Sequence, residues 1–208
     1  MSKPSTALPS FALLLLLVQP GCALLQPKPK EKNETSRSQP AAKSQPKDGG
    51  AQRDESSYAL DPRYRPLVAI VERPPLPGMS STAATTISPK VYVVDLDRWL
   101  KKHPPGTALF EGVIRHEQLH AKRQEAYPGG VDAWVQRYLN DVAFMWDEEQ
   151  RGWAEQIKFL RYGGLKVSAE GVATNLSKYS NLKGSMVSYA DALAWVQDVL
   201  ANRWRPSK

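Results

Sequence analysis

The most informative stretch of this chain reads Gly112-Val-Ile-Arg-His-Glu-Gln-Leu-His-Ala-Lys-Arg-Gln124, and it contains two of the chain's three histidines. His116 and His120 are four residues apart, so on a helix both imidazoles lie on one face and can reach a single metal ion. Glu117 stands beside them, where a carboxylate can take a proton from a metal-activated water and return it to a leaving amine. The spacing therefore predicts a metal site with Glu117 as its general base.

The residues around this motif favour a helix. Apolar residues precede the motif at i, i+3 and i+4 spacing, and the two histidines continue the same stripe, so the ligands would face inward. Thr107 can cap the start of the helix, and Pro128-Gly129-Gly130 can end it. The apolar positions are Leu109, Phe110, Val113 and Ile114.

A second helical pattern runs from Val131 to Leu160, with a break expected near Asn140-Asp141 because the pattern exceeds the usual length of a globular helix. Glu149 falls on its apolar stripe, four residues after Met145. A buried carboxylate is costly unless it is paired or bound to metal. Glu149 is therefore the predicted third metal ligand, unless the helix is half exposed and Glu149 only pairs with an Arg or Lys.

Other candidates for the third ligand remain open. Glu148 is the main alternative to Glu149, and Glu125 and Glu155 are weaker ones. His103 lies in the polar run Lys101-Lys-His-Pro-Pro, which predicts a solvated surface histidine rather than a ligand.

The segment from Phe110 to Leu160, about a quarter of the 208 residues, resembles the zincin metallopeptidases. The HExxH motif at 116–120 carries this resemblance, and a Glu on a later helix makes it closest to the gluzincin type. The resemblance implies an α+β fold, one Zn²⁺ held by His116, His120 and Glu149, and hydrolysis of peptide bonds. Lys122 departs from the family, which usually has an uncharged residue there, and the metzincin extension after His120 is absent.

Zinc hydrolases also need a group that stabilises the oxyanion, commonly a Tyr, His or Arg from elsewhere in the fold. Tyr162, Tyr179 and Tyr189 are the candidates for this role, and the sequence does not rank them. Arg115 and Gln124 flank the motif, where they either orient the ligands or lie on the surface.

The N-terminal part predicts export. Residues 1–22 combine Lys3, an apolar run over residues 11–18 and Gly21-Cys22, which is typical of a signal peptide. Cys22, the only cysteine, resembles the lipidated residue of bacterial lipoproteins, although cleavage after Ala23 is an alternative. Residues 23–57 are rich in Pro, Lys, Gln and Ser and predict a disordered tether, which leaves a domain over residues 58–208.

Within that domain, Leu67–Val71 and Val91–Asp95 read as strands. In zincins an edge strand binds the extended substrate, so either run is a candidate for that edge, and both are equally candidates for buried core strands. Leu96–His103 predicts a short helix, residues 166–185 predict loops or a weak hairpin, and Ser188 can cap a final helix that reaches about Asn202.

The net charge of +7 is spread along the chain, so no basic cluster indicates a nucleic-acid partner. The expected partners are a protein or peptide substrate and, through Cys22, the membrane of a bacterial cell envelope. The alternative is a non-enzymatic envelope lipoprotein, an interaction module whose HExxH motif is fortuitous or inactive. A closed structural zinc site is hard to build with one cysteine and three histidines, which favours an open catalytic site.

Overall fold

The computed structural model describes residues 56–75 and 84–207. The expected signal segment, Cys22 and nearly all of the expected tether lie outside these residues. Within them the chain forms the expected α+β domain, with six α-helices, one short 3-10 helix (Pro62–Tyr64) and small β-sheets. The first strand begins at Ser57, one residue before the expected start of the domain. None of the described helices is long and apolar enough to cross a membrane.

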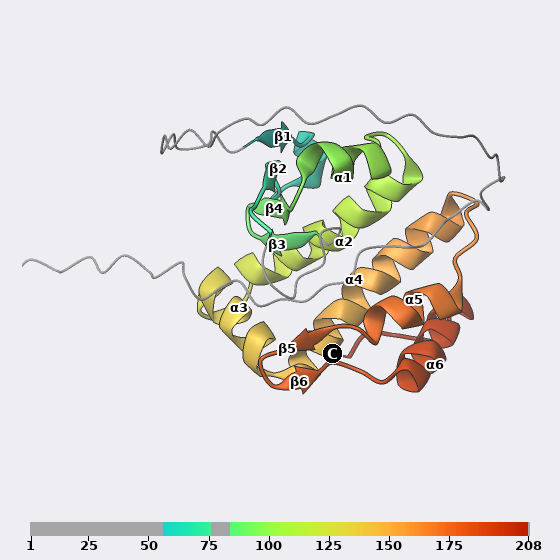
Figure 1. Ribbon diagram of the computed structural model, residues 1–208. Coiled ribbons are helices and arrows are strands. Elements are labelled where there is room, and N and C mark those ends of the chain that lie inside the picture. Colours follow the sequence, from blue (N-terminus) through green and yellow to red (C-terminus); the bar gives the residue numbers. More distant parts are fainter. Residues whose placement is uncertain (1–55, 76–83, 208) are drawn as a thin grey trace, which may run out of the picture.

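A four-stranded mixed sheet forms one side of the domain (Figure 1). Its spatial order is β1-β2-β4-β3, with β2 and β4 parallel and the two outer pairs antiparallel. The two predicted strands, β2 and β4, therefore lie at the centre of the sheet, which confirms the alternative of two core strands and excludes either of them as an edge. The strands are β1 (Ser57–Ala59), β2 (Ala69–Glu72), β3 (Thr85–Ile87) and β4 (Lys90–Val93).

Helix α2 (Ala108–Glu125) carries the HExxH motif and runs between this sheet and the later helices (Figure 1). The Thr107 hydroxyl accepts a hydrogen bond from the Phe110 amide, which confirms the predicted N-cap. Phe110, Val113 and Ile114 of the stripe before the motif pack against the sheet in one apolar core together with Ile70 and Val91. The two histidines follow beside this stripe and point toward α4, where they meet Glu149.

The short helix α1 (Leu96–Lys102) forms as predicted, but the prediction for His103 is wrong. His103 is only 3% exposed. Its ring lies against Trp99 at 4.5 Å between centroids, and its Nδ1–H donates to the Trp99 carbonyl at 3.1 Å. The charged residues around His103 predicted that its side chain would be exposed to solvent, whereas the ring of Trp99, one turn earlier, covers it. Burial lowers the pKa of His103 to about 4.

The long helical pattern divides at the predicted break. Helix α3 (Gly130–Asn140) ends where Asp141 begins α4 (Val142–Tyr162), and the Asp141 carboxylate caps α4 by accepting from the Phe144 amide. Gly163 ends α4. The break turns α3 back toward α2, so that both α3 and α4 contact the motif helix.

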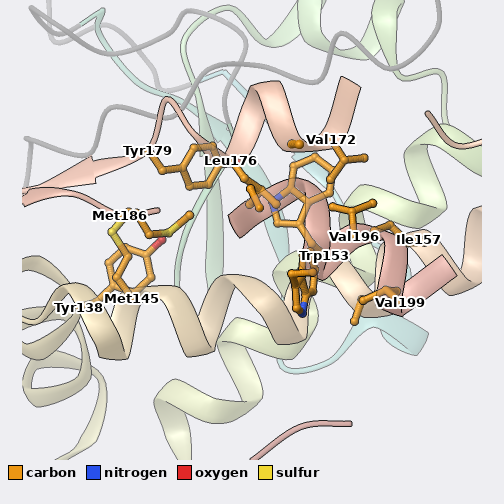
Figure 2. Packing of buried hydrophobic residues seen from close by; sticks show 14 of the residues in the cluster. Tyr138, Met145, Trp153, Ile157, Val172, Leu176, Tyr179, Met186, Val196 and Val199 are labelled. Carbon is orange, nitrogen blue, oxygen red and sulfur yellow. The ribbon is translucent and has the colours of Figure 1, made fainter. Parts of the chain in front are cut away.

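The C-terminal part packs as a second core on α3 and α4 (Figure 2). It contains α5 (Ala169–Leu176), the predicted hairpin formed by β5 (Ser180–Asn181) and β6 (Gly184–Ser185), and α6 (Tyr189–Leu200). Helix α5 was not predicted because it is short and polar, and its buried Val172 and Leu176 gain from tertiary packing. Ser188 caps the start of α6, as predicted, and Val196 of this helix is fully buried in the same core.

Candidate metal centre

Three buried side chains from α2 and α4 converge at the centre of the domain. The Nε2 atoms of His116 and His120 are 2.9 Å apart. Glu149 places Oε2 3.6 Å from Nε2 of His116 and Oε1 3.5 Å from Nε2 of His120. All three residues are at most 5% exposed, and their ligand atoms lie within 4.8 Å of one another. This His-His-Glu group can hold one metal ion.

The distances fit a metal with short bonds. Ligand atoms about 2.0–2.1 Å from a tetrahedral ion lie roughly 3.3 Å from one another. The observed separations of 2.9, 3.5 and 3.6 Å bracket that value, so shifts of a few tenths of an ångström would complete the site. Within residues 56–75 and 84–207 the group has three such ligands and no fourth, which is the ligand number of an open site.

Gln156 on α4 orients the first histidine. Its Oε1 lies 3.2 Å from Nδ1 of His116, which places the ring proton on Nδ1 and leaves Nε2 with a lone pair facing the site. Burial, together with the nearby charge of His120, lowers the pKa of His116 to about 4, although Glu149 opposes the shift. A neutral imidazole is the form that binds metal.

His120 and Glu149 form a charged pair around the place where the metal would lie. Burial lowers the pKa of His120, but contact with Glu149 raises it more, so that the pKa lies above its ordinary value. Burial raises the pKa of Glu149, but the contacts with His120 outweigh it, so that the pKa lies below its ordinary value. Tyr138 on α3 donates a hydrogen bond to Oε1 of Glu149 and fixes that carboxylate from the other side. The site is thus built to hold positive charge, and a metal would displace a proton from His120.

Glu117 lies in the same cavity but outside the ligand group. Its Oε2 accepts a hydrogen bond from the Thr86 hydroxyl at 2.7 Å, and the residue is 6% exposed. Burial raises the pKa of Glu117 to about 7, although His120 and Thr86 act in the opposite direction. A carboxylate with this pKa can both accept and release a proton near neutral pH.

Strand β3 is attached to the motif helix by Gln124. The Gln124 side chain is fully buried, donates to the Thr86 carbonyl at 2.9 Å and accepts from the Ser88 amide at 2.8 Å. These two bonds hold the strand so that Thr86 meets Glu117. Gln124 therefore positions β3, whereas Arg115, the other flanking residue considered, lies on the surface beside Glu155 at 3.7 Å.

Gly152 allows α4 to approach His116. A Cβ atom added at this glycine would lie 2.6 Å from Nε2 and 2.7 Å from Cδ2 of the His116 ring. No side chain fits at that distance from an aromatic ring whose position is set by Gln156. The close approach brings Glu149, one turn earlier on α4, next to both histidines.

A cavity of about 20 Å³ opens beside the ligand group. Helix α2 contributes the two histidines and Glu117 to its wall, and α4 contributes Glu149. The rest of the wall comes from α3 and from the β3 side, with Trp134, Tyr138, Ala84, Thr85 and Thr86. A cavity needs a volume of roughly 10–15 Å³ to hold one water molecule. The cavity therefore admits one water-sized group next to the metal ligands and the carboxylate of Glu117.

The alternative third ligands lie elsewhere. Glu148 is fully buried, but both its oxygens pair with Arg123 of α2 at 2.6 Å. Glu125 accepts a hydrogen bond from the Ser88 hydroxyl at 2.7 Å at the surface. Of the five acidic and histidine candidates considered for this role, only Glu149 reaches the two histidines.

The three tyrosines considered for oxyanion stabilisation do not line the cavity. Tyr162 is 94% exposed at the end of α4, and Tyr189 is 43% exposed at the start of α6. Tyr179 is buried in the second core and is not among the residues that line the cavity (Figure 2). Tyr138, which the sequence analysis did not single out, is the tyrosine at the site.

Four residues of the site escaped the sequence analysis: Thr86, Tyr138, Gly152 and Gln156. Two of them carried a usable signal. Gly152 is a glycine inside a strong helical pattern, which often marks a close contact, and Gln156 is a polar residue that follows Glu149 by seven positions on the same face. Thr86 and Tyr138 depend on the packing of β3 and α3 against α2, which no local pattern shows.

Comparison of the chain with protein-family models, with curated proteins and with solved structures gives no match.

Proposed function

We propose that this protein is a zinc-dependent peptidase in which His116, His120 and Glu149 hold the metal and Glu117 is the general base. The observation that supports this most strongly is the convergence of the three ligands with a second buried carboxylate, Glu117, beside one small cavity. A purely structural His-His-Glu site has no need of a second carboxylate that does not contact the ligand group.

The donor set favours zinc. Two imidazole nitrogens and one carboxylate are a common set for catalytic Zn²⁺, and three protein ligands leave one coordination place for a water or a substrate. Zinc bound here would supply Lewis acidity, which activates a water and polarises a carbonyl group. Sulfur ligands, which mark many structural zinc sites, are lacking among the residues that the structure describes.

The protein's own groups would then manage the protons. Thr86 holds Oε2 of Glu117, so Oε1 is the atom that takes a proton from the attacking water and later delivers it to the leaving amine. Gln156 keeps Nε2 of His116 directed at the metal, and Tyr138 keeps Glu149 in place. Near-complete burial of these groups strengthens each of these interactions.

The decisive experiment compares the wild type with Glu117→Gln. Zinc content is measured by mass spectrometry of the purified proteins, and cleavage is measured on a mixture of peptides. We expect one zinc per chain in both proteins and cleavage by the wild type alone. Glu125→Gln, which changes an exposed carboxylate on the same helix, is the matched control and should cleave like the wild type.

Two other outcomes separate the alternatives. A wild type that binds no zinc would contradict the metal site and leave the motif fortuitous. A wild type that binds zinc but cleaves no peptide would support the non-enzymatic interaction module instead.

We further propose that the domain is anchored to a bacterial envelope membrane through Cys22. Lys3, the apolar run over residues 11–18 and the Gly21-Cys22 pair support this. Incorporation of radiolabelled palmitate into the full chain, and its loss in Cys22→Ser, is the expected result. Equal labelling of both proteins, or of neither, would contradict the anchor.

A further inference from the structure

One buried hydrogen-bond donor in the wall of the cavity has no role in the metal site described above. Trp134 of α3 lines the cavity and is 4% exposed. Its indole Nε1 is buried and has no hydrogen-bond partner among residues 56–75 and 84–207. An unsatisfied buried donor costs about 1–3 kcal/mol, and because Trp134 lines the cavity, an acceptor atom that enters the cavity with a ligand would remove this cost.

The Trp134 ring is held firmly. It stacks on Tyr138 with 4.8 Å between centroids and 20° between planes, and Phe144 meets it edge-on at 5.7 Å. The ring of His120 lies 5.8 Å from it. A donor fixed in this way beside a metal ligand is preorganised and needs no rearrangement when an acceptor enters.

Two hydroxyl groups of the cavity wall already have acceptors. The Tyr138 hydroxyl donates to Glu149, and the Thr86 hydroxyl donates to Glu117. Thr85 and His120 also line the cavity, and the Thr85 hydroxyl and Nδ1 of His120 are buried without a partner in the described ranges. A hydroxyl can rotate and can either donate or accept, and His120 is one of the proposed metal ligands, whereas the Trp134 indole is fixed and only donates.

An indole N–H only donates, so its partner in the cavity must be an acceptor atom. A volume of about 20 Å³ admits a single oxygen-sized group and excludes a side chain. We infer that Trp134 is a catalytic residue whose Nε1–H donates to the carbonyl oxygen of the scissile peptide bond as that oxygen becomes an oxyanion. The inference rests on the proposed peptidase function. It assigns to Trp134 the stabilisation of the oxyanion, because Tyr162, Tyr179 and Tyr189 do not line the cavity.

The test compares Trp134→Phe with Trp153→Phe, using a peptide that the zinc-loaded wild type cleaves. Trp153 is the matched control because its indole Nε1 is also buried without a partner among the described residues and its ring lies 5.7 Å from His116, yet it does not line the cavity. We expect Trp134→Phe to lower kcat about 100-fold with little change in KM. Trp153→Phe should stay within about threefold of the wild type, and both variants should retain one zinc.

A second readout does not depend on turnover. In zinc-loaded, ¹⁵N-labelled Glu117→Gln protein, the indole N–H resonance of Trp134 should move downfield when the same peptide is added. The resonance of Trp153 should stay in place. The two resonances are assigned from the spectra of the two Phe variants.

Equal losses of kcat in the two Phe variants, or an unmoved Trp134 resonance, would overturn the inference while the peptidase function stands. Absence of any cleavage by the zinc-loaded wild type would overturn the proposed function and this inference with it. If Trp134→Phe fails to fold, 3-benzothienylalanine at position 134 keeps the shape of the ring without the N–H. It should show the same loss of kcat, and normal activity would overturn the inference.

Discussion

Gly152 shows how much a single residue contributes to the metal site. Gly→Ala inside a helix normally stabilises a protein by up to about 1 kcal/mol, because alanine is the better helix former. Here the added methyl group would overlap the ring of His116. Helix stability therefore favours alanine at this position, whereas the space needed by the His116 ring requires glycine.

We predict that Gly152→Ala lowers zinc affinity by roughly 100-fold or more. Loss of a group that only orients a metal ligand lowers metal affinity by about 10–100-fold, and displacement of the ligand itself should cost at least as much. Competition with a fluorescent zinc chelator measures the affinity. Gly171→Ala on α5 is the control, because its Cβ would meet nothing closer than 3.4 Å. Equal zinc affinities of the two variants would show that zinc binding by His116 does not depend on the missing side chain of Gly152.

His103 makes a residue-scale prediction about pH. Its pKa is about 4 in the folded protein and close to 6.5 when the chain is unfolded, because burial disfavours the charged ring. Between these values the unfolded chain binds more protons, so stability falls as the pH is lowered from 6.5 to 4. Above pH 6.5 the contribution is constant.

We expect the free energy of unfolding to drop by up to about 3 kcal/mol across this pH window because of His103. Urea denaturation of the wild type and of His103→Gln at a series of pH values measures it. The difference between the two plots of unfolding free energy against pH gives the contribution of His103 alone, because the histidines of the metal site are the same in both proteins. A constant difference between pH 4 and 6.5 would contradict the low pKa.

At the scale of elements, an ion pair joins the two helices that supply the ligands. Arg123 of α2 binds Glu148 of α4 through Nε and Nη2, each at 2.6 Å. The Glu148 carboxylate is fully buried, whereas Arg123 is 35% exposed. Removing the guanidinium leaves a buried carboxylate that must either stay unpaired or take up a proton, and both are costly.

We predict that Arg123→Met lowers the free energy of unfolding in urea by about 2–3 kcal/mol, the lower end for a broken buried pair. Arg203→Met is the control. Arg203 pairs with Asp198 at 2.6 Å, but both side chains are about half exposed or more, at 67% and 48%. Such a pair contributes less than about 1 kcal/mol, so similar losses in the two variants would show that burial of Glu148 is unimportant.

For the whole molecule, the metal site lies where two apolar cores meet. One core contains the sheet, α1 and the stripe of α2 before the motif, and the other contains α3 to α6. The histidines belong to α2 and Glu149 to α4, so a bound ion would join the two cores. Metal binding and folding of the domain should therefore be coupled.

We expect removal of zinc with a chelator to lower the melting temperature by roughly 10 °C, which follows from about 4 kcal/mol of binding energy at zinc concentrations 1,000-fold above Kd. Differential scanning calorimetry measures it. The chelator should lower the melting temperature of Glu117→Gln by the same amount. It should lower that of Glu149→Gln much less, because this variant lacks the anionic ligand and binds zinc weakly. A melting temperature of the wild type that ignores the chelator would contradict the coupling.

Much of this molecule is predictable from local patterns. The helix around His116 and His120, its Thr107 cap, the break at Asp141 and the inward direction of Glu149 all follow from helical periodicity and capping chemistry. Each of these depends on residues within a few turns of one another along the chain. The sequence alone thus determined the three residues of the His-His-Glu group and the class of the fold.

Tertiary structure decided the rest. The position of β3 beside α2, the hydrogen bonds of Thr86 and Tyr138, and the pairing of the buried Glu148 with Arg123 join residues that lie on separate elements. Strands as short as β1 and β3 carry too few residues for alternation to mark them. Such contacts depend on how separate elements pack around a shared core, and that packing is a property of the whole chain rather than of any segment.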